Sequence, residues 1–286
     1  MYQSMPPHEH ALFHAKNRVP SNCRDRLDHL SFLLDTQGPA ASDKINTVYG
    51  IHKALFSDRN SLPKQHQELI CSATQKLAEF GRAHTLSGPA AHHLREMLST
   101  LRDVLRPTIR NLSPENLESV LRACEARPAL ASSLGHELAS RGADKLERLS
   151  PQSLHTLLML PDAAKMPKDT LTKLAAALVE TVATANTSRL TAWAQRFLEL
   201  DIRSPDVVDG LACEALERIK ALPFIETRNL CVGIQSLCNP LIDADVPFET
   251  RQMLSATFNA FTGSLEDQPD SLMCQLAKMR ASFRAD

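Results

Sequence analysis

The sequence predicts an all-α protein: an α-solenoid of antiparallel helix pairs preceded by an irregular N-terminal arm. Three observations favour this class. The 286 residues include only 9 glycines and 5% aromatic residues, whereas sheets depend on turn glycines and on aromatic or β-branched strands. Apolar residues recur at helical spacing along most of the chain. From residue 112 onward, a helix-opening pattern returns about every 37 to 42 residues.

Residues 1–40 are predicted to form the arm. They contain four prolines, several histidines and one candidate helix, over residues 24–34. Basic residues such as Lys16 and Arg18 give the segment a faint likeness to an organellar presequence, but the Arg-rich and Ser-rich amphipathic pattern of such a presequence is not seen. A retained or partly processed targeting segment is one interpretation, and a plain extension is the other.

Residues 41–111 are predicted to form an N-terminal helical region. Apolar residues follow a period of 3.6 in three stretches: 43–56, 63–81 and 88–107. Residues that end helices separate these stretches: Gly81, Gly88 with Pro89, and Pro107. The third stretch is expected to be one long helix, and the sequence does not indicate its partner.

Residues 112–286 are predicted to be helical repeats. The segment LSPENLESVLRAC, which begins at Leu112, matches LSPQSLHTLLMLP, which begins at Leu149, at an offset of 37 residues. Each segment has a Leu-Ser-Pro opening, a polar pair and then apolar positions at helical spacing. The anchor leucines of five units are Leu117, Leu154, Leu190, Leu230 and Leu272, spaced by 37, 36, 40 and 42 residues.

The repeated opening has a physical reason. Ser113 and Ser150 are expected to cap their helices by accepting a hydrogen bond from a free backbone N–H. Pro114 and Pro151 then occupy the first helical position, where the missing N–H of proline costs nothing. The same first position is filled in the other units by Thr187, Thr227 and Pro269.

A second helix is predicted in each complete unit. Its apolar residues are Leu130, Leu134 and Leu138; Leu171, Leu174, Ala175 and Leu178; Val208, Leu211, Ala212, Ala215 and Ile219; and Met253, Leu254, Phe258 and Phe261. Two antiparallel helices cannot bury their apolar faces alone, so neighbouring pairs are expected to stack into a solenoid. An irregular helical bundle, whose helices merely have similar lengths, is the alternative.

Charge and hydropathy limit the partners. The net charge is −1, with a balance of +4 over residues 1–111 (14 Lys and Arg against 10 Asp and Glu) and of −5 over the rest (18 against 23). A protein that gripped nucleic acid along its whole length would be strongly basic, so any such contact is expected to be local. The uncharged run of residues 229–242, which no other run exceeds in length, is too short to cross a bilayer, and no membrane span is predicted.

No catalytic motif is found. The sequence has no Gly-rich phosphate loop, no nucleophile elbow and no His-Glu-x-x-His pattern. We therefore expect no enzyme activity, no catalytic residue, no cofactor and no small-molecule substrate. An enzyme would need a cleft with convergent polar groups, which the sequence does not reveal.

Histidines form the nearest approach to a metal site. His10 and His14 could share a helix face, with His8 nearby, but no carboxylate or thiolate stands in register with them. We expect surface histidines there and no metal. His92 and His93 are adjacent and would point about 100° apart on a helix, so they are expected to be solvated and not to form a ligand pair.

Cysteines and the single tryptophan are expected in the core. The seven cysteines include no Cys-x-x-Cys pair and are predicted to be reduced thiols. Cys231 and Cys238 lie two turns apart on one helix face, where core packing is favoured over a redox pair or a metal site. Trp193 lies at an apolar position of its repeat, which favours a core role over a stacking platform for a base.

Arginine placement on the helix predicted over residues 88–107 gives the candidate RNA-binding site. Arg95, Arg102 and Arg106 fall within about 40° of one another at roughly 100° per residue, and Arg110 extends the row if the helix continues past Pro107. Arginine presents a fixed fork of donors that suits phosphate oxygens. The alternatives are a solvated helix face or ion pairs with neighbouring acids.

The Leu-Ser-Pro-polar-polar-Leu opening, the spacing near 37 and the helix pairs resemble the heptatricopeptide-type and FAST-kinase-like helical repeats of organellar RNA-metabolism proteins and divergent mitochondrial ribosomes. The resemblance covers residues 112–286 at most and is closest over residues 112–180. Such families often end in a mixed α/β RAP domain, whereas residues 270–286 read as one more helix, so no nuclease-like module is expected. The pentatricopeptide spacing and the octotricopeptide Pro-Pro-Pro-Glu-Trp motif are not seen, which disfavours a base-by-base code.

The resemblance implies a mitochondrial protein that binds RNA or docks within an RNA–protein assembly. We therefore expect a non-enzymatic subunit of a mitochondrial ribonucleoprotein, most concretely the mitochondrial ribosome. Its basic N-terminal part would contact RNA, expected to be rRNA, and its acidic repeats would contact other protein subunits. The alternative is a protein-binding scaffold, or a supernumerary subunit of another organellar complex, without RNA contact.

Overall fold

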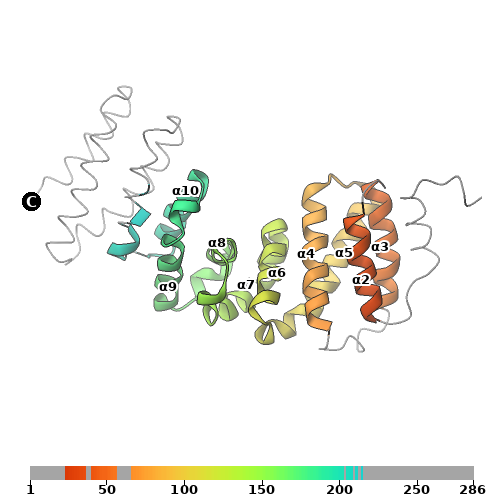
Figure 1. Ribbon diagram of the computed structural model, residues 1–286, viewed down its shortest axis with the longest axis horizontal. Helices are drawn as coiled ribbons and strands as arrows, with labels where there is room; N and C mark the ends of the chain where they lie inside the picture. The colour runs from red at the N-terminus through yellow and green to blue at the C-terminus, as the bar shows by residue number, and fades with distance from the viewer. Residues whose placement is uncertain are drawn as a thin grey trace, which may run out of the picture. The chain divides into compact units, whose positions relative to one another are not determined.

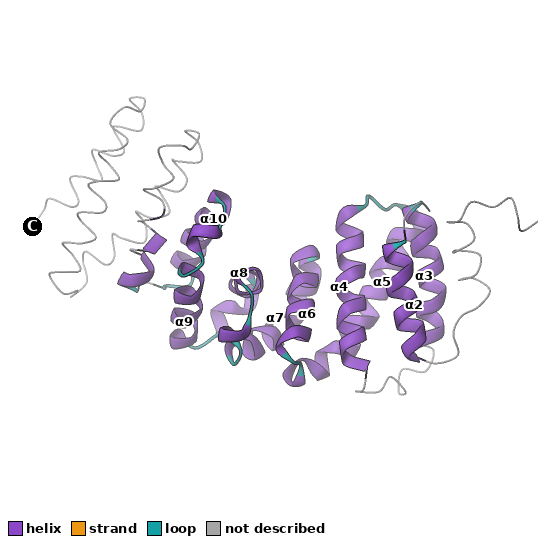
Figure 2. Cartoon of the chain, viewed as in Figure 1, coloured by secondary structure: helices purple, strands orange, loops and turns teal. Residues whose placement is uncertain are grey.

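Helices are the only regular structure in the part of the chain that the structure describes (Figure 1, Figure 2). The computed structural model describes residues 23–36, 40–56, 66–202, 204–208, 210, 211 and 214. No strand occurs in these ranges, so the predicted all-α class is confirmed for them. The chain divides into two compact units, Met1–Lys165 and Met166–Asp286.

The first unit contains seven α-helices within its described residues. They are α2 (Cys23–Asp35), α3 (Ala41–Phe56), α4 (Gln67–Ala83), α5 (Gly88–Leu105), α6 (Pro114–Ala126), α7 (Pro128–Ala143) and α8 (Pro151–Met159). Three short 3-10 helices accompany them: η4 (Arg106–Asn111), η5 (Leu146–Arg148) and η6 (Pro161–Lys165). None of the described helices is both long and apolar enough to cross a membrane.

Helices of the first unit contact one another in two rows. In one row, α2 contacts α4, α4 contacts α6, and α6 contacts α8. In the other row, α3 contacts α5 and α5 contacts α7. Contacts also join the rows, between α4 and α5 and between α6 and α7. Each helix therefore packs on the helix after next as well as on its neighbour in sequence.

The candidate helix predicted over residues 24–34 forms as α2, and it belongs to this packing, whereas the sequence places it in an otherwise irregular arm. Leu27, Leu30 and Leu33 are at most 1% exposed, and α2 contacts both α3 and α4. Burial of each such leucine contributes about 1.5–3 kcal/mol, which is enough to fix a short helix against two others. A boundary at residue 40 therefore cuts through a packed structure.

Helix α4 runs past the residue predicted to end it. Gly81 is buried inside the last turns of α4, which ends at Ala83, and the side chains of Arg127, between α6 and α7, and of Leu94 in α5 lie where a Cβ atom would be. Gly81 is thus present for close packing and not as a helix end. Helix α5 has the partners that the sequence left unnamed, because it contacts α3 and α4.

The repeated helix openings form as predicted. The Ser113 hydroxyl accepts a hydrogen bond from the Asn116 N–H (3.3 Å), and the Ser150 hydroxyl accepts one from the Ser153 N–H (3.4 Å). Pro114 and Pro151 are the first residues of α6 and α8. A capping side chain at each opening therefore satisfies one of the free N–H groups of the first turn.

The second unit contains helices α9 (Lys168–Val179) and α10 (Thr187–Glu199) and the 3-10 helix η7 (Val182–Thr184). Thr187 is the first residue of α10, as expected, and the Asn186 side chain is the cap. Trp193 is 1% exposed, so its core role is confirmed. The predictions for Thr227, Cys231 with Cys238, Pro269, the later repeats, and His8, His10 and His14 lie outside the described residues.

Candidate functional site

The four arginines of the predicted row do not share one environment. Arg95 and Arg102 lie on α5, whereas Arg106 follows the end of α5 and Arg110 lies in η4. The α-helix ends at Leu105, and η4 turns about three residues per turn, so Arg110 leaves the line that a continuous α-helix would have given it. The condition under which Arg110 is expected to extend the row, an α-helix that continues past Pro107, is therefore not met.

Neighbouring groups already bind part of this row. The Arg102 guanidinium pairs with Asp103 (2.7 Å) and donates to the Ser99 hydroxyl (3.0 Å). Arg106 is turned toward α7, where it pairs with Glu137 (3.3 Å). Arg95 donates only to a backbone carbonyl, that of Ala91 (3.2 Å), among the described residues. The ion-pair alternative thus holds for Arg102 and Arg106, and Arg95 keeps its charge unpaired.

A groove with a volume of about 680 Å³ lies between α4, α5 and α7, and two residues of the row line it. We call it the arginine groove, after the four arginines that line it: Arg82, Arg95, Arg102 and Arg127. The other polar lining residues are His84, Thr85, Ser99 and Ser133. The remaining lining residues are Gly81, Leu86, Ala91, Leu94, Leu98, Ala129 and Leu130.

The charges in the groove have one sign. Among the described residues that line it, four are arginines and none is Asp or Glu. Asp103, which pairs with Arg102, is not a lining residue. Arg102 is paired with Asp103, whereas Arg95 and Arg127 form no ion pair within the described residues. Cations without a paired acid in a partly closed groove attract anions more strongly than the same charges spread over an open surface. The groove is therefore suited to an anionic ligand.

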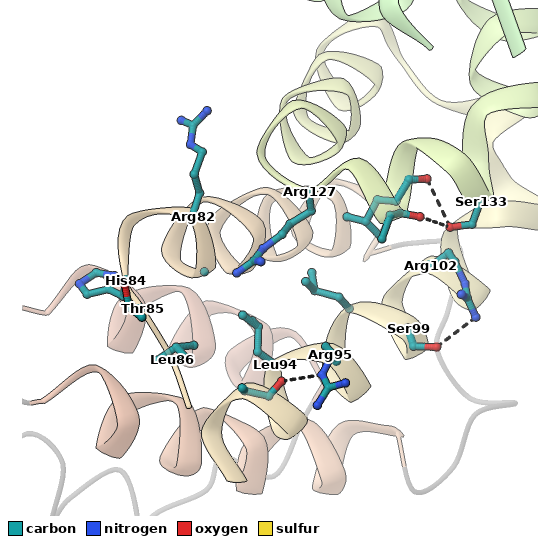
Figure 3. A pocket seen from close by; sticks show the side chains of 15 residues that line it. Arg82, His84, Thr85, Leu86, Leu94, Arg95, Ser99, Arg102, Arg127 and Ser133 are labelled. Atoms are coloured by element: carbon teal, nitrogen blue, oxygen red, sulfur yellow. Dashed lines mark hydrogen bonds between the residues drawn. The ribbon is translucent and has the colours of Figure 1, made fainter. Parts of the chain in front are cut away.

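Arg127 is the least satisfied of these arginines. Its Nε atom is buried without a hydrogen-bond partner, and within the described residues its guanidinium forms no ion pair. The guanidinium lies against α4 at Gly81, whose missing Cβ leaves room for it. Figure 3 shows Arg127 reaching over the groove, with Arg95, Ser99 and Arg102 along α5 and with Arg82 turned outward.

The first turn of α7 also lies at the groove. Arg127 is both the last cap residue of α6 and the N-cap residue of α7, and no side chain caps this start of α7. Ala129 and Leu130, in the first turn, line the groove. The N-terminal end of a helix carries a partial positive charge, which adds to that of the arginines.

His84 lies at another part of the groove lining and is held firmly. Its ring stacks on Phe80, with 4.2 Å between ring centroids and 20° between planes. Its Nδ1 atom lies 3.0 Å from the Phe80 carbonyl oxygen. Phe80 itself is buried, so the histidine ring has a fixed support on one side.

A second polar cluster lies between α3 and α5. The Tyr49 hydroxyl donates a hydrogen bond to Glu96 (2.5 Å), which lowers the pKa of Glu96, and the Tyr49 ring stacks on His93 at 3.8 Å. His93 also bonds to Asn46 (3.0 Å), whereas the neighbouring His92 is solvated as expected, with 66% of its side chain exposed. No group of three possible metal ligands occurs among the described residues.

Sequence reasoning found Arg95 and Arg102 but missed Arg82, His84 and Arg127. Arg82 and His84 follow the predicted end of a helix, and Arg127 stands between two predicted helices. A local pattern could not connect them, because the groove depends on the packing of α4 and α5 with α7. The Arg127-Pro128 pair, which marks a helix start, gives the position of Arg127 along the chain but not its neighbours.

Comparison with known proteins adds no relative: no protein-family model matches the chain, and no curated protein matches it either. The kinship with heptatricopeptide-type and FAST-kinase-like repeats stays a prediction.

Proposed function

We propose that this protein is a non-enzymatic helical-repeat subunit of a ribonucleoprotein assembly and that it contacts RNA phosphates through the arginine groove. One observation carries the proposal: four arginines line a groove that has no acidic lining residue among those described. Phosphate contacts supply most of the affinity of sequence-independent RNA binding. A groove of this kind provides such contacts at one place on a chain whose net charge is −1.

Arg127 supports the proposal most directly. A planar guanidinium that is fixed in place loses little conformational freedom when it binds a phosphate. Gly81 provides the space that fixes it, and its buried Nε atom has no intramolecular hydrogen-bond partner among the described residues. Arg95, whose guanidinium also lacks a carboxylate partner there, is the second available cation.

The α-solenoid is the second part of the proposal. The two rows of contacts in the first unit, from α2 to α8 and from α3 to α7, are those expected of stacked helix pairs. We propose that the same stacking continues through the later repeats and that the acidic part of the chain binds other protein subunits. Assignment to mitochondria and to the ribosome rests on the resemblance of the repeats alone.

Fluorescence anisotropy with the full chain and a labelled, single-stranded RNA of mixed sequence tests RNA contact. If three of the groove arginines each neutralise one phosphate, log K falls against log salt concentration with a slope of about −2. Arg95→Ala and Arg127→Ala should each weaken binding several-fold and reduce this slope. Arg148→Ala, at an exposed arginine of η5 outside the groove, is the matched control and should leave binding unchanged.

Two results would contradict RNA contact: no salt-dependent binding, or an equal loss in the groove variants and in the control. Affinity purification with and without ribonuclease then distinguishes the protein-binding scaffold. Partners that remain after ribonuclease treatment, together with flat anisotropy, would favour a scaffold without RNA contact.

A further inference from the structure

The arginine groove is not only basic. Six of its fifteen lining residues are Leu or Ala, and they lie between the arginines. Leu94, Leu98 and Leu130 present parts of otherwise buried side chains to the groove. A site that served phosphates alone would gain nothing from this apolar lining, because phosphate oxygens prefer donors and water. The lining therefore indicates a ligand with an apolar face beside its negative charge.

Duplex RNA lacks such a face. Its bases are stacked inside the helix, and the surface that it offers to a protein consists of phosphates, 2′-hydroxyl groups and base edges. Unpaired nucleotides differ, since their bases can be splayed out and laid on apolar or aromatic side chains. A groove of about 680 Å³ is also within the size range of sites for small ligands, which includes a single nucleotide.

His84 places an aromatic ring at one end of the groove, at the connection between α4 and α5 (Figure 3). Phe80 stacks on the ring and holds it, and His84 lines the groove, so the ring is positioned before any ligand arrives. Bases stack on His as well as on Phe, Tyr and Trp in RNA-binding proteins. Thr85, Ser99 and Ser133 add hydroxyl groups that can bond to base edges or to a 2′-hydroxyl group.

We infer that the arginine groove binds an unpaired nucleotide of single-stranded RNA, with the base on the leucines and His84 and with the phosphates on Arg95, Arg102 and Arg127. This inference rests on the proposed function and makes it specific. A groove of this kind distinguishes single-stranded from paired RNA and does not read the base sequence. Its basis is the combination, in one groove, of four arginines without an acidic lining residue, an apolar lining and an aromatic ring held in place by Phe80.

The test compares three labelled probes of equal length on the full chain at one salt concentration: a mixed-sequence single strand, the same strand paired with its complement, and an abasic ribose-phosphate strand. We expect the single strand to bind at least tenfold more tightly than the other two. His84→Ala should weaken binding of the single strand about tenfold and leave the abasic strand unaffected. Arg127→Ala should weaken all three, and the Arg148→Ala control none.

The outcomes separate the inference from the function on which it rests. Equal affinity for all three probes, with a common loss in Arg127→Ala, overturns the inference while RNA contact stands, because phosphates alone then account for binding. If His84→Ala binds the single strand as tightly as the unaltered chain does, His84 is not a stacking surface, and the inference is overturned too. Binding of no probe overturns both. If polyglutamate displaces the labelled single strand as effectively as the unlabelled single strand does, the groove binds an acidic protein segment, and the inference is overturned.

Discussion

Replacement of Gly81 by alanine tests whether the position of Arg127, and not merely its charge, produces binding. A Cβ atom at this position would overlap the Arg127 Nη2 atom and the end of the Leu94 side chain, and it would lie 2.8 Å from the Arg127 Cζ atom. Atoms in contact prefer separations of about 3.5–4.0 Å, so the guanidinium must move by about 1–2 Å. The variant keeps the net charge and every arginine of the groove.

Two terms of opposite sign determine its stability. Alanine stabilises a helix interior by about 0.5–1 kcal/mol relative to glycine. The added atom overpacks the site, which typically costs about 1–3 kcal/mol, toward the lower end here because both displaced groups are ends of side chains. We expect a net loss of about 0.5 kcal/mol in the free energy of unfolding. RNA affinity should fall about tenfold, because one displaced charge-assisted hydrogen bond is worth about 1.5 kcal/mol.

The assay is urea unfolding followed by circular dichroism, together with anisotropy against the single-stranded probe. Gly50→Ala is the matched control, because Gly50 lies within α3 and a Cβ atom there meets nothing within 4 Å. The control should gain about 0.5–1 kcal/mol of stability and keep its RNA affinity. A folded Gly81→Ala variant that binds RNA as tightly as this control would refute the idea that Gly81 positions Arg127 for binding.

Three further predictions follow from helix caps, thiols and the single tryptophan. Ser113→Ala and Ser150→Ala should each lower the free energy of unfolding by about 1 kcal/mol in urea titrations, since each removes an N-cap; unchanged midpoints would contradict this. Burial raises the pKa of Cys71 and Cys124 to about 12. Between about pH 9 and 12, these thiols ionise only in the unfolded chain. The free energy of unfolding should therefore be unchanged below about pH 9 and fall as the pH rises from about 9 to 12, and this fall should be smaller in a variant with alanine at both positions. Trp193, the sole tryptophan and 1% exposed, should emit at short wavelength and shift to the red when the second unit unfolds; an already red native spectrum would argue against its burial.

The helices could be predicted because their determinants are local. A serine that accepts the N–H three residues ahead, followed by proline, needs nothing beyond its own turn, and both Ser113 and Ser150 behave in this way. Periodic leucines likewise mark the face that each helix buries. Helix α2 was placed in an arm because the prolines around it indicate loops, and nothing in the sequence tells that α3 and α4 cover its leucines.

The site was harder to predict, for a physical reason. At about 100° per residue, Arg95, Arg102 and Arg106 lie on one side of a helix, but this spacing does not reveal that Glu137 of α7 pairs with Arg106. The Arg127 guanidinium meets Gly81 only because helices distant in sequence pack together. Local patterns give a residue its secondary structure and its face. Tertiary packing determines whether an acidic partner neutralises the charge of that residue.

A single residue, Arg127, connects α6 to α7. Helix α6 ends at Ala126 and α7 begins at Pro128, so the φ and ψ angles of Arg127 alone set the direction in which the second helix departs from the first. Any rotation about the backbone bonds of Arg127 would move Leu130 and Ser133 of α7 relative to α6. A phosphate that clamped the Arg127 side chain against α4 would therefore also lock the joint, so occupancy of the groove and stiffness of the helix pair would rise together.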